Sequence, residues 1–242
     1  ARRPGHRHAP GAAQTTRVPR HRARALAVRG AGDEGAAKVR NAVCEWGKGE
    51  AVVVGQLAKL APPFAALANG MAAHALDFDD TFLEPITHAS ASLVPALFAL
   101  GDEINVTGDA IVDAYIVGLE MHGALGLALC RSHYEQGWHA TATIGVIGTA
   151  GACARLLGLD TKRFSHAMNL AFSSAAGTKV QFGSMAKPFQ GLKAAQNAIR
   201  TLLASQVGAY QYEKYSRQKN QFNLFGCFQW PARHLFNFPG LS

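Results

Sequence analysis

Residues 107–125 read TGDAIVDAYIVGLEMHGAL, and this stretch decides the fold class. Thr107 can cap a helix with its hydroxyl, and Asp109 in the first turn suits the positive end of the helix dipole. Core-type side chains then recur every three or four positions, at Ile111, Tyr115, Leu119, His122 and Leu125. This spacing predicts a helix of about five turns with one side against a core.

On both sides of that helix, residues 62–208 are rich in alanine and repeat the helical spacing of apolar side chains. Five more helices are predicted, at 62–78, 90–100 (interrupted by Pro95), 140–157, 161–177 and 188–208. Proline stands where the first and last of them begin, and glycine ends the last three. Glycines 145, 148 and 151 should let another backbone approach closely. With one short strand expected at 51–54, the fold class is all-α.

Charge is unevenly distributed along the 242 residues, which hold 24 Lys and Arg against 16 Asp and Glu. The net charge is +8 over residues 1–40, −3 over 41–209 and +3 over 210–242. We therefore expect a basic, disordered segment, a helical domain, and an atypical tail rich in aromatic and amide side chains. Because the basicity belongs to the ends, no nucleic-acid surface is predicted on the folded middle.

The four cysteines are far apart and form no CxxC pair: Cys44, Cys130, Cys153 and Cys227. This predicts reduced thiols and an intracellular, cytoplasmic chain. The Arg-rich, acid-poor start superficially resembles a transit peptide, so a mitochondrial location is the alternative. The longest charge-free stretch, 136–154, contains Gln, His and three Thr, and we expect no membrane span.

Residues 74–81 read HALDFDDT and bring three carboxylates within four positions. Like charges this close repel one another unless they are solvated, hydrogen-bonded or bound to a cation. If the helix continues here, Asp77 and Thr81 share one face. A solvated helix end is the plain alternative. A Mg²⁺ site would need a second acidic cluster, which the later sequence does not offer, so no metal is predicted.

Three later segments each place a basic group where a helix is expected to begin: His88, His139 and Lys187. Taken singly, such residues are more often ordinary surface groups. Gathered at helix starts, where free N–H groups favour anions, they would repel one another without an anionic ligand. We therefore expect the two imidazoles and the ammonium group to converge on a site for a small acid.

Four motifs carry a family resemblance: NGMAAHALDFDDT (69–81), THAS (87–90), HYEQGWHATATIGVIGTAGACARLLGLD (133–160) and FGSMAKP (182–188). In order and spacing they resemble the MmgE/PrpD family, which includes 2-methylcitrate dehydratases, cis-aconitate decarboxylases and an iminodisuccinate epimerase. The resemblance covers about residues 62–209. It implies an all-α domain, a second α+β lid domain, a homodimer, and a polycarboxylate site that needs no organic cofactor or obligatory metal.

Carried over position by position, the resemblance implies a site of Asp77, Thr81, His88, His139 and Lys187. Lys187 would bind a carboxylate and stabilise developing charge, and Thr81 would hydrogen-bond a carboxylate oxygen. His88 and His139 would act as general acid and base in either order, with Asp77 orienting one of them.

The sequence departs from the family pattern at two points. The lid domain is apparently lacking, and Gln190 stands where the family usually has a histidine. The favoured hypothesis is a cofactor-independent lyase that dehydrates a 2-methylcitrate-like acid or decarboxylates a cis-aconitate-like acid. The alternative is a truncated, inactive remnant that dimerises, and a nucleic-acid binder using the basic start ranks third.

Overall fold

In the computed structural model, the described residues are 27–57, 59–83 and 85–206. The elements are α2 (Glu34–Val43), β1 (Lys48–Val52), β2 (Lys59–Leu60), α3 (Pro62–His74), α4 (Ala89–Ile104), α5 (Gly108–Glu135), α6 (Ala140–Leu156), α7 (Thr161–Ser174), the 3₁₀ turn η1 (Lys179–Gln181) and α8 (Ala186–Gln206). Apart from the two-stranded antiparallel sheet, the regular structure of the described part is helical. The predicted helical fold is confirmed.

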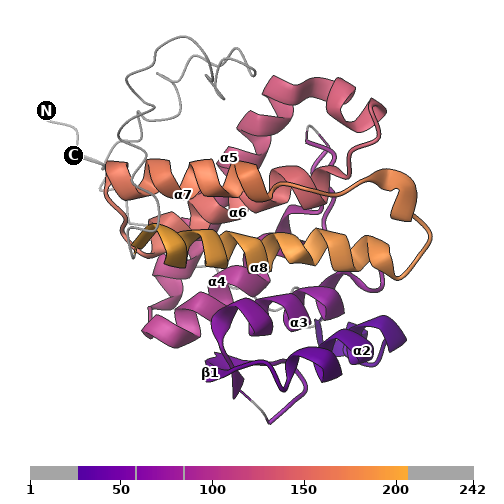
Figure 1. Cartoon of the computed structure of the whole chain (residues 1–242), viewed down its shortest axis with the longest axis vertical. Coiled ribbons are helices and arrows are strands. Elements are labelled where there is room, and N and C mark those ends of the chain that lie inside the picture. Colours follow the sequence, from indigo (N-terminus) through magenta and orange to yellow (C-terminus); the bar gives the residue numbers. More distant parts are fainter. Residues whose placement is uncertain (1–26, 58, 84, 207–242) are drawn as a thin grey trace, which may run out of the picture.

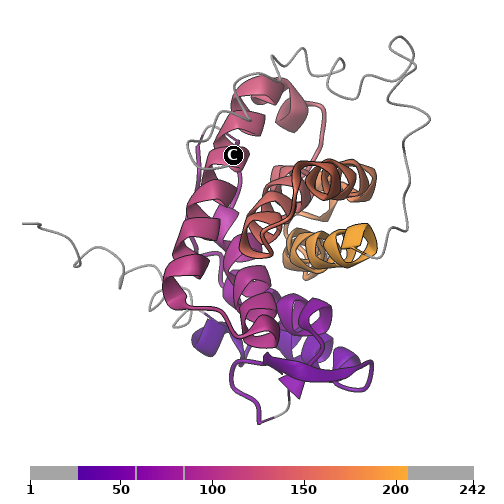
Figure 2. The same ribbon diagram turned by 90° about the vertical axis from the view of Figure 1, so that its left-hand side faces the viewer.

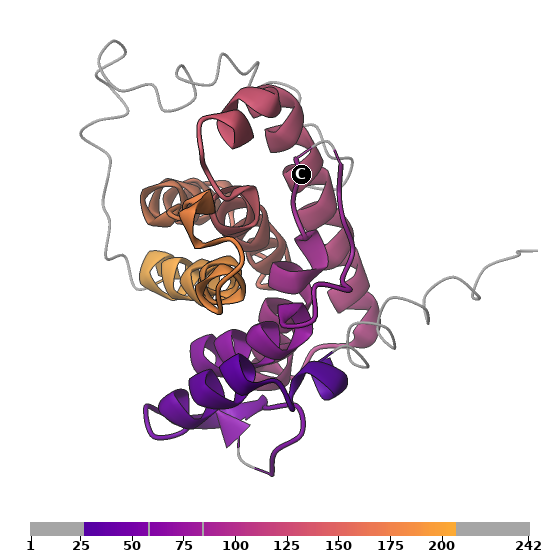
Figure 3. The ribbon, with the colours of Figure 1, turned by 90° about the vertical axis from the view of Figure 1, so that its right-hand side faces the viewer.

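Helix α6 is the centre of the fold, because α4, α5, α7 and α8 all pack against it. Figure 1 shows α7 and α8 side by side across the molecule, and Figure 2 shows the long α5 along one side. Helices α2 and α3 and the small sheet occupy one end (Figure 3). A helix surrounded in this way must be apolar on all sides, and α6 is buried from Ala140 to Ala154.

The glycines of α6 make room for side chains of neighbouring helices. A methyl group at Gly148 would overlap the ring of His122, and one at Gly151 would overlap the Met121 sulfur, both from α5. At both positions the nearest atoms are side-chain atoms of α5, so the absence of a Cβ on α6 lets α5 pack closely against it.

Several predicted helix boundaries agree with the structure. Thr107 accepts a hydrogen bond from the Ala110 N–H at 3.4 Å, and Asp160 accepts one from the Arg163 N–H at 2.8 Å. Gly158 follows α6 with a positive φ of 61°, as expected of a residue that ends a helix.

Other boundaries differ from the prediction. Helix α5 has 28 residues and extends to Glu135, well beyond the five turns or so that the sequence predicts. Helix α4 continues through Pro95 without interruption. Helix α8 begins at Ala186, so Lys187 lies inside its first turn and not before it. Tertiary packing along α4 and α5 outweighs the local stop signals.

Helix α2 crosses the compositional boundary at residue 40 and packs on α3. Asp33 caps it by accepting a hydrogen bond from the Ala36 N–H at 3.1 Å. Residues 1–26 of the basic segment and the whole tail 210–242 lie outside the described residues.

One segment, Gly108–Leu129 of α5, is long and apolar enough to cross a membrane when judged by length and composition alone. Core helices of water-soluble proteins pass the same test. One third of the segment is buried in the structure, and Met121 and His122 on its inner face contact α6.

Replacing glycines in α6 should test this packing. Gly148→Ala should lower the free energy of unfolding by about 1–3 kcal/mol, because its methyl group collides with the His122 ring. Gly145→Ala is the matched control: its methyl group would lie 3.4 Å from Ala194 Cβ and from Ser92 Oγ. Since alanine favours the helix, we expect that control to be neutral or stabilising by up to about 1 kcal/mol. Urea unfolding measures both, and equal effects would contradict the packing described.

Candidate active site

Three helix starts meet at one place. His88 is the N-cap residue of α4, His139 is the N-cap residue of α6, and Lys187 is in the first turn of α8. The His88 N–H donates to Thr141 Oγ1 at 3.1 Å, which joins the starts of α4 and α6. Because the N-terminal ends of helices carry partial positive charge, this convergence suits an anion.

The loop after α3 brings acidic groups to the same place. The helix ends at His74, and Asp77 has a positive φ of 55°, so the chain turns here. The hypothesis that the helix continues, with Asp77 and Thr81 on one face, is therefore wrong. The physical reason is Asp79, whose carboxylate turns back to meet the His74 ring.

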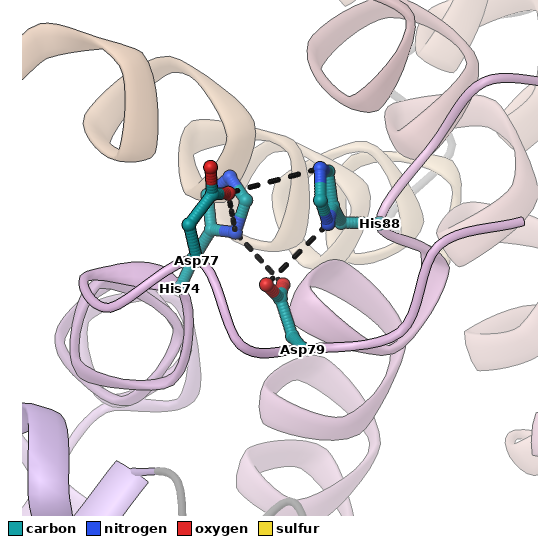
Figure 4. A group of neighbouring side chains, drawn as sticks. All are labelled: His74, Asp77, Asp79 and His88. Atoms are coloured by element: carbon teal, nitrogen blue, oxygen red, sulfur yellow. Dashed lines mark hydrogen bonds and ion pairs between the residues drawn. The ribbon is translucent and has the colours of Figure 1, made fainter. Parts of the chain in front are cut away.

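Figure 4 shows four side chains from this region facing one another: His74, Asp77, Asp79 and His88. Asp79 lies between the two imidazoles, with Oδ2 2.7 Å from His74 Nδ1 and Oδ1 3.4 Å from His88 Nδ1. The His88 ring also has Nε2 3.8 Å from Asp77 Oδ1. The carboxylate side chain of Asp79 is only 4% exposed, so the two rings provide its polar surroundings.

Lys187 reaches this group from the opposite end of the sequence. Its Nζ donates to both carboxylate oxygens of Asp77, at 2.6 and 2.7 Å. The ammonium group also lies 5.6 Å from the ring centre of Phe182. A bidentate ion pair between residues 110 positions apart ties α8 to the loop after α3.

The two carboxylates are held in their charged forms. Burial alone would raise the pKa of the Asp79 carboxyl, but hydrogen bonds and charge from His74 and His88 outweigh it and hold that pKa well below its ordinary value. Burial would also raise the pKa of the Asp77 carboxyl, but the hydrogen bond and the charge of the Lys187 ammonium group outweigh it. The pKa of Asp77 is therefore lowered.

The two predicted catalytic histidines have opposite electrostatic environments. The hydrogen bond from His88 to the Asp79 carboxylate raises the pKa of His88 above its ordinary value. The pKa of His139 is lowered to about 4, chiefly by burial and additionally by charge on His74, Lys187 and His88. Near neutral pH, His88 therefore holds its proton readily and His139 is a neutral base.

His139 and Thr81 complete the set of residues predicted from the sequence. His139 is 3% exposed, and its ring meets the edge of Phe182 at 5.1 Å. Thr81 is exposed and, within the described part of the chain, makes no side-chain hydrogen bond to the four residues of Figure 4. The structure thus brings Asp77, His88 and Lys187 into contact and His139 beside them, and leaves Thr81 outside.

The sequence analysis gave no role to three residues of this site. His74 and Asp79 were within the quoted motif, but nothing local distinguished Asp79 from its acidic neighbours. Gln190 was noted only as a departure from the family. Its Oε1 accepts from the Thr178 N–H at 3.1 Å, and its side chain also hydrogen-bonds His139. The amide therefore holds the loop before α8 against His139.

The residues of Figure 4 also form a set that could hold a divalent cation, since one donor atom from each lies within 4.8 Å of the others. Two imidazole nitrogens and two carboxylate oxygens suit a borderline ion such as Zn²⁺. Lys187 already pairs with Asp77, and the two imidazoles already contact Asp79, so the arrangement does not require a metal.

An NMR titration of the histidine ring protons should separate three groups. His88 should titrate above 6.5, whereas His139 and the fully buried His122 should titrate near 4. Histidines with lowered pKa values make the folded chain less stable as pH falls below 6.5, because the unfolded chain then binds more protons than the folded chain. His88 acts oppositely: its contribution is present at low pH and is lost as pH rises through its raised pKa.

Two variants make this titration specific. Asp79→Asn removes the charge that raises the His88 pKa, so that pKa should fall toward its ordinary value. Asp113→Asn, which removes an exposed ion pair with Arg155, should leave all three histidines unchanged. A His88 that titrates below 6.5 in the unaltered chain would contradict the geometry.

The chain is similar in sequence to several known proteins. Over 155 residues the chain is 30% identical to cis-aconitate decarboxylase of Homo sapiens. The matched region covers 62% of this chain and 32% of that protein. It is 32% identical over 154 residues to cis-aconitate decarboxylase of Aspergillus terreus, covering 61% of this chain and 31% of the relative. The cis-aconitate decarboxylase-like protein oryM of Aspergillus oryzae is 29% identical over 170 residues, covering 66% and 35%.

The chain therefore spans about a third of the length of the curated relatives it matches. Residues 23–213 match the MmgE/PrpD N-terminal domain, which is most of the chain. With the motifs and the fold in agreement, the chain belongs to the MmgE/PrpD family.

Proposed function

We propose that this chain forms the helical part of a lyase that acts on a small polycarboxylate by proton transfer, without a cofactor. One observation carries the proposal: His88, His139 and Lys187 lie together at the starts of three helices, with the pKa of His88 raised and that of His139 lowered to about 4. The relatives named cis-aconitate decarboxylase support the lyase class. The exact acid and the choice between dehydration and decarboxylation belong to the proposal.

Lys187 binds a substrate carboxylate in this scheme. Its ammonium group is held by Asp77 and shares the positive end of α8, so a carboxylate that enters meets a fixed charge. The same charge stabilises the enediolate-like anion that forms when electron density moves onto that carboxylate. Asp77 therefore positions the lysine, and Asp79 takes the role of orienting His88.

The histidines divide the proton transfers according to their pKa values. In dehydration, His139 takes the proton from the carbon next to a carboxylate, and His88 donates its proton to the departing hydroxyl, which leaves as water. In decarboxylation, the electrons of the broken C–C bond move onto the remaining unsaturated acid, CO₂ leaves, and His88 delivers a proton to carbon. Thr81 lies outside the cluster, so we assign it no step.

Exposed apolar side chains near the site favour a second candidate. Phe78 and Leu83, between α3 and α4, and Val180, in η1 before α8, are largely exposed. An apolar rim of this kind is typical of a surface that another subunit or segment covers. In that case the chain associates, as a homodimer or with a longer relative, and has no activity by itself. Measuring its mass in solution beside the activity assay separates the two candidates.

Substitution of the three basic groups should abolish turnover. Lys187→Ala, His88→Ala and His139→Ala should each lower kcat for cis-aconitate or 2-methylcitrate by at least about 100-fold, because each removes charge stabilisation or a proton-transfer group. Lys193→Ala is the matched control, since this exposed lysine lies on the same helix α8 and should leave the rate unchanged.

The pH profile gives an independent check on the division of roles. The rate should fall as pH rises through the raised pKa of His88, which then loses its acidic proton. It should also fall as pH drops toward about 4, where His139 becomes protonated and ceases to act as a base. Full activity in the three alanine variants would refute the proposal.

A further inference from the structure

Four side chains of the site are arranged like the ligands of a small cation (Figure 4): His74, Asp77, Asp79 and His88. One donor atom from each lies within 4.8 Å of the others. Zn²⁺ is usually bound by four nitrogen, oxygen or sulfur atoms in a tetrahedron, with bonds to nitrogen and oxygen of about 2.0–2.2 Å. The ligand atoms of such a tetrahedron are about 3.3–3.6 Å apart. The group therefore has the composition, and nearly the spacing, of a zinc site.

The distances within the group lie on both sides of this spacing. Asp79 Oδ1 is 3.4 Å from His88 Nδ1, and Asp77 Oδ1 is 3.9 Å from His74 Nδ1. The contact between Asp79 Oδ2 and His74 Nδ1, at 2.7 Å, is shorter and has to lengthen by about half an ångström. Small rotations of the side chains produce changes of this size. The ion itself then lies at the centre of the group, between the donor atoms.

Two buried atoms of the group are poorly paired. The contact between Asp79 Oδ1 and His88 Nδ1, at 3.4 Å, is long for a hydrogen bond, and neither atom has a better partner. The Asp79 side chain is only 4% exposed, and buried polar atoms are nearly always paired in folded proteins. A cation placed between these two atoms would pair both of them at once.

We propose that this group binds a borderline divalent cation such as Zn²⁺ in competition with Lys187. Lys187 Nζ donates to both carboxylate oxygens of Asp77, at 2.6 and 2.7 Å, so the ammonium group and the ion compete for one carboxylate. The Asp77 side chain is 56% exposed, which gives an ion access from solvent. Binding releases any proton on the imidazole nitrogens that the ion takes, so the free rings need not be neutral beforehand.

Occupation of this group would inhibit the lyase. The binding site stands on the geometry alone, whereas its effect on turnover rests on the proposed function. A bound ion holds His88 as a ligand, so this ring no longer serves as the acid. The ion also takes Asp77 away from Lys187, and the ammonium group loses the carboxylate that positions it. Zn²⁺ should therefore stop the reaction, and removing the ion with EDTA should restore it.

Titration of the full chain with Co²⁺, which takes zinc sites and absorbs visible light, tests the binding site. Four-coordinate Co²⁺ on nitrogen and oxygen ligands absorbs in the visible, without the thiolate charge-transfer band that a cysteine site would add. Asp79→Asn and His88→Ala should each weaken binding at least about tenfold, since each removes a ligand. Lys187→Ala should strengthen it roughly two- to fivefold, because the competing ammonium group is gone. Displacement of Co²⁺ by Zn²⁺ gives the affinity for Zn²⁺.

Asp113→Asn is the matched control, because this exposed carboxylate lies outside the group and should leave binding unchanged. Histidines within residues 1–26 bind cations equally in every variant, so the differences between variants report on the group. Circular dichroism verifies the helical fold of each variant. Undiminished binding in both ligand variants means an adventitious ion only and overturns the inference. Unchanged or weaker binding in Lys187→Ala overturns it as well.

Failure of the proposed function gives a different result. If the chain turns over neither cis-aconitate nor 2-methylcitrate, that function fails for this chain, and the cobalt titration still decides whether the group binds a cation. If the chain is active, Zn²⁺ should inhibit it at the concentrations that fill the site, and EDTA should restore the rate. Full activity with the site filled would overturn the inhibition.

Discussion

A carboxylate that is 4% exposed must find partners inside the protein, and Asp79 finds them in two imidazoles. The need to pair this charge accounts for much of the local structure. It draws the loop back over the end of α3 and fixes the His74 ring. It also raises the pKa of His88 at the start of α4.

The packing of the helices brings the positively charged groups of the site together, which the buried charge of Asp79 alone does not do. Small residues along α6 let four helices pack around it, and their packing brings the starts of α4, α6 and α8 together. Positive helix ends, Lys187 and His88 then lie in one region of a domain whose sequence is mildly acidic overall. The basic pI of the chain comes from its ends. The ligand proposed above, a multiply charged small acid, would complement such a region.

Local sequence predicted the elements better than their contacts. Caps such as Thr107 and Asp160 and the apolar periodicity identified the helices, and basic residues at helix starts identified His88, His139 and Lys187 as candidates. The turn at Asp77 was missed because nothing in HALDFDDT shows which carboxylate will be buried. The true length of α5 was missed because packing against α6 overrides local signals. Where the Gln190 side chain lies depends on Thr178 and His139, which belong to other elements, and no local pattern encodes such contacts.

The most direct test is a crystal structure of the chain grown with cis-aconitate. The account predicts that one carboxylate of the acid lies within hydrogen-bonding distance of Lys187 Nζ, with the carbon skeleton between the rings of His88 and His139. A well-ordered acid bound elsewhere, with these three groups arranged as in the free chain, would contradict it.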